Sequence, residues 1–178
     1  MTSDPSTASH EHRVALEMAS HIKRARIALV LSGILYAWAA YGSYDRIMGM
    51  CRAFQFPAAW GEGSCLSIAF PPDDPIGRLV ARYLFIIVLA GIAATVNLAF
   101  AAIARKRLTI AIYTAVGIFA VYTALSLYQM AGLLSTWVWW LTAIVLGLGV
   151  QAAAKANQLH KSRQLAKARL VADASISA

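Results

Sequence analysis

The chain has 178 residues, of which 60% are of hydrophobic types and only 13% are charged, and its mean hydropathy is +0.61. Soluble domains carry about 25% charged residues, so this composition excludes a soluble globular enzyme and a disordered chain. Two cysteines are too few for a disulfide-dense secreted fold. The net charge of +8 does not indicate nucleic acid, because the basic residues flank apolar segments instead of forming one basic domain.

Four apolar segments are long enough to cross a bilayer, which takes about 20 residues per helix. The stretch from Leu108 to Ala154 contains no charged residue and holds two of these segments. Gly132 and the pair Ser135-Thr136 are the turn-like residues available between them. The predicted spans, in chain order, are 27–44, 79–104, 108–134 and 136–154. We therefore expect an all-α integral membrane protein, a four-helix bundle of up-down-up-down topology.

The distribution of Lys and Arg predicts the orientation of this bundle. Twelve of them lie in the N-terminal segment 1–26, the loop 105–107 (Arg105, Lys106 and Arg107) and the tail 155–178. The segment 45–78 combines three arginines with four acidic residues. The positive-inside rule then places both termini and the 105–107 loop in the cytoplasm, with 45–78 outside. We expect a multi-pass protein of a bacterial inner membrane.

The two tails resemble helices that lie at the membrane surface. Val14, Met18 and Ile22 recur at helical spacing, which favours a short amphipathic helix before the first span. The basic residues of 155–178 indicate either a solvated continuation of the fourth span or contact with a partner subunit or anionic lipid headgroups.

The extracytoplasmic segment 45–78 contains both cysteines, Cys51 and Cys65. We expect them to form a structural disulfide, since a bridge over this loop stabilises by roughly 3 kcal/mol in the chain-entropy model. A redox-active dithiol is the less favoured interpretation, because such pairs are closely spaced and need a second pair to relay electrons. A Cu(I) site at Met48, Met50 and Cys51 is a further alternative, and it requires Cys51 to be unpaired.

The middle of each predicted span lacks Asp, Glu, Lys, Arg and His. This pattern disfavours proton-driven transporters and ion pumps, which depend on buried ionisable groups. No catalytic residue and no cofactor are predicted, since all four histidines lie outside the spans. The spans instead contain small residues and amides at spacings typical of helix packing: Gly117, Ala120, Ala124, Ala143 and Gly147, with Asn97 and Gln151. Trp137, Trp139 and Trp140 open the fourth span and indicate an aromatic belt at the outer interface.

These features favour a non-catalytic accessory or structural subunit of a larger membrane complex. The expected partners are other membrane subunits, in a hetero-complex or a homo-oligomer. A single bundle needs only inward-facing small residues, so surplus packing faces indicate further partners. The alternative is a channel or facilitator for a small neutral solute or lipid, with a path along polar side chains of the spans: Asn97, Tyr113, Tyr122, Thr123 and Ser126. A third hypothesis is an extracytoplasmic thiol-redox or copper-binding protein. Unrelated membrane families share the four-helix plan, so topology alone does not decide between these functions.

Overall fold

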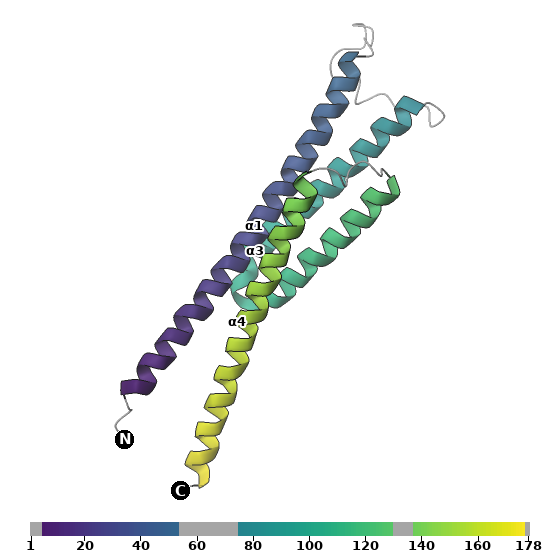
Figure 1. The fold of residues 1–178 in the computed structure, drawn as a ribbon. Helices are drawn as coiled ribbons and strands as arrows, with labels where there is room; N and C mark the ends of the chain where they lie inside the picture. The colour runs from purple at the N-terminus through teal and green to yellow at the C-terminus, as the bar shows by residue number, and fades with distance from the viewer. Residues whose placement is uncertain (1–4, 54–74, 130–136, 177–178) are drawn as a thin grey trace.

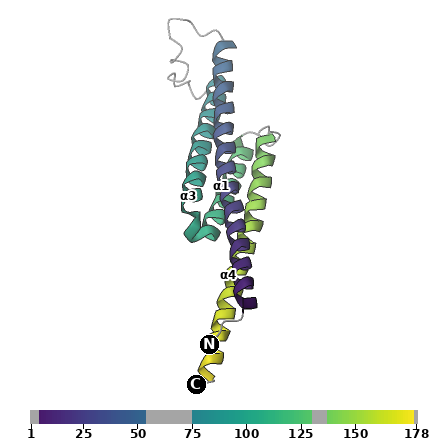
Figure 2. The ribbon, with the colours of Figure 1, turned by 90° about the vertical axis from the view of Figure 1, so that its left-hand side faces the viewer.

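A computed structural model describes residues 5–53, 75–129 and 137–176. They form three helical elements, α1 (Pro5–Ala53), α3 (Pro75–Gln129) and α4 (Trp137–Ile176). Figures 1 and 2 show that α3 reverses direction part-way, so that its two arms run side by side. The first arm contains Arg78–Ile103 and the second contains Leu108–Leu127. Four stretches are long and apolar enough to cross a membrane: His12–Gly49, Arg78–Ile103, Leu108–Leu127 and Trp137–Ala166. The prediction of an all-helical protein with four such helices is confirmed.

The helices extend well beyond the predicted apolar segments. α1 is continuous from Pro5 to Ala53, so the N-terminal segment and the first span share one helix. α4 likewise continues into the basic tail as far as Ile176. In an α-helix the backbone N–H and C=O groups form hydrogen bonds to one another within the segment. This is needed in lipid, which offers these groups no other partners. Residues 105–107, predicted as a loop, lie within the bounds of α3, close to its reversal.

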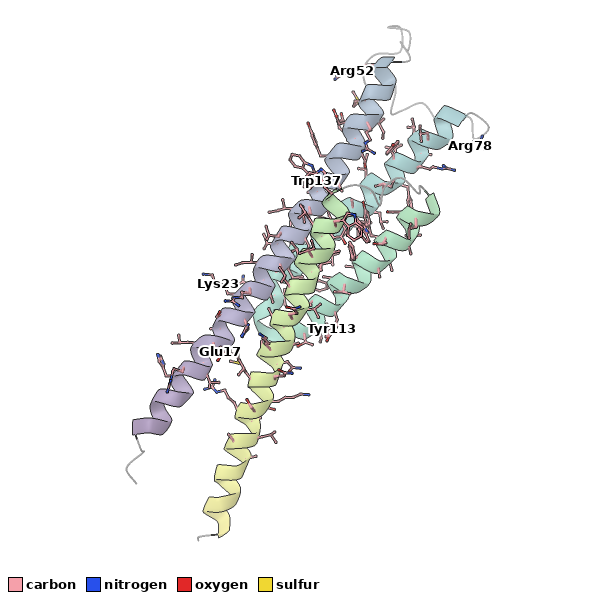
Figure 3. All side chains as sticks on the ribbon, in the orientation of Figure 1. Glu17, Lys23, Arg52, Arg78, Tyr113 and Trp137 are labelled. Atoms are coloured by element: carbon pink, nitrogen blue, oxygen red, sulfur yellow. The ribbon has the colours of Figure 1, made fainter. Side chains whose placement is uncertain are left out.

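Both chain termini lie at the same end of the molecule, as Figure 1 shows. The reversal of α3 faces that end too, whereas the last turn of α1 and the start of α3 lie at the opposite end. Arg52 and Arg78 lie at this opposite end (Figure 3). The described basic residues of the N-terminal segment and the tail are therefore gathered at one end of the bundle.

The core consists mainly of small residues from all three elements. In one cluster, Leu29, Ile112 and Leu146 are surrounded by alanines of α1, of both arms of α3 and of α4: Ala25, Ala101, Ala111, Ala115, Ala152 and Ala153. A second cluster joins Tyr36 of α1 to both arms of α3, through Ile86, Ala90, Ala93, Ala94 and Tyr122. Alanine lets helix backbones approach closely, and close packing is the main attraction between helices in lipid.

Two glycines lie where neighbouring helices approach closely. A Cβ added at Gly149 of α4 would lie 2.9 Å from the Cβ of Ala28 and 3.1 Å from Cδ1 of Ile112. A Cβ added at Gly33 of α1 would lie 2.9 Å from Cγ of Leu98 and 3.3 Å from the carbonyl oxygen of Ala94. These positions have room for hydrogen only, so Gly33 and Gly149 set the helix separations at the centre of the bundle.

Candidate functional sites

A short chain of hydrogen bonds crosses from α1 to the first arm of α3. Asn97, which is 0% exposed, donates from Nδ2 to Oγ of Ser32 at 3.1 Å. The Ser32 hydroxyl donates in turn to the carbonyl oxygen of Leu29 at 2.9 Å. Oδ1 of Asn97 has no partner among the described residues. This arrangement links α1 to the first arm of α3.

Arg26 makes a second polar link between the same two helices. Its Nε donates to the carbonyl oxygen of Ala101 at 2.9 Å, near the end of the first arm of α3. A hydrogen bond from a charged guanidinium to a carbonyl oxygen is stronger than one between neutral groups. Arg26 was predicted only to set orientation, and the structure gives it this additional contact.

A cavity of about 380 Å³ lies between α1, the second arm of α3 and the start of α4. Its walls are largely aromatic, with six such side chains: Tyr36, Trp38, Phe119, Tyr122, Trp137 and Trp139. Along α1 the lining extends from Tyr36 to Arg46, about 15 Å of helix axis. The cavity is in the size range of sites for small organic ligands.

The hydroxyl groups at the cavity differ in whether they have a hydrogen-bond partner. The Ser43 hydroxyl donates to the carbonyl oxygen of Ala39, and that of Thr142 to the carbonyl oxygen of Val138. The hydroxyls of Tyr36 and Ser126 are buried and have no hydrogen-bond partner among the described residues. Tyr36 and Tyr122 meet edge to face, with ring centroids 5.2 Å apart. Because an unsatisfied buried hydroxyl costs about 1–3 kcal/mol, these groups favour a bound polar atom nearby.

The three tryptophans predicted as an interfacial belt have different environments. Trp137 and Trp140 are each 58% exposed, as belt residues would be. Trp139 is partly buried, and its Nε1 donates to Oγ1 of Thr123 at 2.9 Å. Trp139 therefore fastens the start of α4 to the second arm of α3.

The five residues predicted along a solute path have different surroundings in the structure. Tyr122 and Ser126 line the aromatic cavity, and Thr123 lies beside it as the acceptor for Trp139. Asn97 belongs to the hydrogen-bonded link with Ser32. Tyr113 is 59% exposed and points away from the bundle (Figure 3). The five residues thus belong to three separate environments.

The small residues predicted to pack helices mostly face outward. Gly117, Ala120 and Ala124 are exposed on the second arm of α3, and Gly147 is exposed on α4. A Cβ added at Gly117 or Gly147 would meet no described neighbour within 4 Å. The inward packing positions are other small residues, which the spacing analysis did not single out: Gly33, Ala111, Ala115, Gly149 and Ala153. Ala143 is partly buried, and Gln151 is exposed.

Several predicted sites fall on residues whose side chains the structure does not describe. These are Met50, Cys51, Cys65 and the basic triplet Arg105, Lys106 and Arg107. The predicted disulfide and the alternative copper site therefore lie outside the described residues. Among the residues that are described, no three His, Cys, Asp or Glu side chains gather into a potential metal site.

The chain matches no protein-family model, no curated protein and no solved structure at a significant level. The chemistry and placement of its own residues therefore carry the functional conclusion.

Proposed function

We propose that this protein is a non-catalytic accessory subunit of a larger membrane complex. The outward small-residue face of the second arm of α3, formed by Gly117, Ala120 and Ala124, carries the proposal. The same arm already buries Ala111 and Ala115 against α1 and α4, so the bundle does not need this second set for its own packing. A face of small residues allows a further helix to approach closely in lipid.

The test is native mass spectrometry of the protein extracted in nanodiscs from its own membrane. Wild-type protein should migrate with other subunits at fixed stoichiometry, and Gly117→Leu should lose them because the larger side chain holds a partner helix away. Gly91→Leu is the matched control, since a Cβ at Gly91 also meets no described neighbour within 4 Å but lies on the other arm. A wild-type monomer or homo-oligomer would contradict the proposal.

A second candidate function is the binding of a small neutral solute or lipid in the aromatic cavity. Its support is the combination of aromatic walls with the two unpartnered hydroxyls of Tyr36 and Ser126. Such a site suits a molecule with an apolar body and a single hydrogen-bonding group.

Gly42 offers a way to fill this cavity without disturbing the fold. It lines the cavity, and a Cβ there meets no described neighbour within 4 Å. Gly42→Leu should abolish any added mass that gentle extraction leaves on the wild-type chain. Gly49→Leu, a substitution at an equally open glycine of the same helix outside the cavity, should retain that mass. Equal retention by both variants would show that the molecule binds elsewhere.

For the orientation, we propose that both termini are cytoplasmic, that residues 45–78 are extracytoplasmic and closed by a Cys51–Cys65 disulfide, and that the membrane is a bacterial inner membrane. The twelve basic residues of 1–26, 105–107 and 155–178 support this orientation.

A further inference from the structure

A second hollow, an open groove of about 290 Å³, lies between α1 and α4 toward the end of the molecule where both termini lie. α1 and α4 run in opposite directions here (Figure 1). On both helices the lining changes from apolar to basic side chains toward the end where the termini lie. The lining residues are His21, Arg24, Ile27, Ala28 and Leu31 from α1, with Val145, Leu148, Gln151, Ala152 and Lys155 from α4.

The groove changes from apolar to basic along its length. On α1 the lining changes from Leu31 and Ile27 to Arg24, and on α4 from Val145 and Leu148 to Lys155. At 1.5 Å per residue, these stretches span about 10 Å and about 15 Å. The groove therefore has a cationic end on the side where the chain termini lie and an apolar floor toward the middle of the bundle.

The charges at the basic end are not neutralised by the groove itself. Arg24 and Lys155 are exposed, and no carboxylate is among the described residues that line the groove. Oε1 of Glu17 lies 3.9 Å from Nε2 of the buried His21, and the Glu17 side chain is largely exposed. Lys23 and Arg26 lie on the same stretch of α1, at an adjoining hollow, and add to the positive potential.

The apolar part of the groove is open to the side, where the bilayer would be. Ile27, Leu31 and Leu148 are all exposed although they line the groove. A soluble anion would leave this apolar floor unused, whereas a phospholipid has a charged head and an apolar chain in the same order.

We propose that this groove is a binding site for a phospholipid with an anionic headgroup. The headgroup phosphate lies between Arg24 and Lys155, with the Gln151 amide as a further donor, and one acyl chain lies along Ile27, Leu31 and Leu148. Bound there, the lipid bridges α1 and α4 and stabilises their contact. The site is independent of the accessory role and of the aromatic cavity.

The experiment measures lipid binding to the full-length protein in detergent by native mass spectrometry. The probes are phosphatidylglycerol and phosphatidylcholine with identical acyl chains, and inorganic phosphate as competitor. The test variant is Arg24→Gln/Lys155→Gln. The control Arg13→Gln/Lys161→Gln removes the same charge from exposed residues of the same two helices outside the groove. Arg24→Lys/Lys155→Arg keeps the charge and should retain binding.

We expect the wild type to bind phosphatidylglycerol more tightly than phosphatidylcholine. Because each basic residue at a membrane surface contributes about 1 kcal/mol toward anionic lipid, the test variant should bind phosphatidylglycerol about thirtyfold more weakly. Its affinity for phosphatidylcholine should fall much less, because the choline cation offsets the phosphate charge, and the control should resemble the wild type. An equal loss in the control would show diffuse surface attraction, and competition by millimolar inorganic phosphate would show a soluble-anion site; either result overturns the proposal.

Discussion

At the scale of single residues, the polar groups inside the bundle act as fasteners between helices. The one hydroxyl hydrogen of Ser32 goes to the carbonyl oxygen of Leu29, so its oxygen is free to accept from Asn97. The two bonds polarise each other in the same direction, which strengthens both. The link is modest in free energy because side-chain hydrogen bonds in membranes also find other partners in the unfolded state.

A double-mutant cycle over Ser32→Ala and Asn97→Ala should give a coupling free energy of about 0.6 kcal/mol, and no more than about 1.7 kcal/mol. Reversible unfolding in mixed micelles measures it. The matched cycle pairs Ser32→Ala with Thr95→Ala, whose hydroxyl bonds to Gly91 within its own helix and should show no coupling. Zero coupling in the first cycle would contradict the hydrogen bond between Asn97 and Ser32.

Neighbouring tryptophans at the start of α4 should respond differently to the same substitution. Trp139→Phe removes the donor to Thr123 and should lower the free energy of unfolding by about 1 kcal/mol. Trp140→Phe, at an exposed ring, should change it by less than about 0.5 kcal/mol. Unfolding followed by circular dichroism checks both, and equal effects would argue against the Trp139–Thr123 contact.

At the scale of elements, the position of α4 against α1 and α3 depends on which of its glycines faces inward. Gly147 and Gly149 are two residues apart, so they point about 200° away from each other around the helix. Gly149 sits against Ala28 and Ile112, whereas the space above Gly147 is open. The Cβ of an alanine cannot move without its backbone, so Ala28 cannot yield to a larger residue at Gly149.

Gly149→Ala should therefore destabilise the bundle by about 1–3 kcal/mol through overpacking. Gly147→Ala should be neutral or stabilise it by up to about 1 kcal/mol, because alanine is the better helix former and meets no described neighbour. Denaturant midpoints of the two variants in the same detergent give the comparison. A Gly149→Ala variant as stable as Gly147→Ala would show that α4 does not pack on α1 through this face.

At the scale of the whole molecule, the basic residues and the hollows lie at different positions along the long axis of the bundle. The chain termini, the groove between Arg24 and Lys155, and the reversal of α3 face one end, while the aromatic cavity lies toward the other. In the proposed orientation the first end is cytoplasmic, where anionic lipid attracts basic residues. Tryptophans then lie near the outer interface.

Labelling with a membrane-impermeant maleimide tests this orientation in a Cys51→Ser/Cys65→Ser background. Ser64→Cys should be labelled in intact cells, because 45–78 is expected outside. Ser175→Cys should be labelled only after the cells are permeabilised. Labelling of Ser175→Cys in intact cells would show that the orientation is the opposite of the one proposed. The basic groove would then face the outer side of the membrane.

Much of the architecture followed from local properties of the chain. Apolar length predicts four membrane-crossing helices regardless of how they pack, because the bilayer thickness sets the requirement. What the sequence did not predict is which side of the second arm of α3 faces inward: Ala111 and Ala115 lie in the core, and Gly117, Ala120 and Ala124 face outward.

The sequence by itself thus predicted a membrane protein with four membrane-crossing helices. It also showed that most basic residues lie in three segments. The tertiary structure decided the packing faces, the aromatic cavity and the basic groove. The physical reason is that lipid tails are as apolar as a protein core, so the outward face of a membrane helix needs no polar residues. The inward and outward faces of these helices are therefore equally apolar in sequence. Gly33 and Gly149 differ from Gly117 and Gly147 only in having close neighbours in the folded bundle.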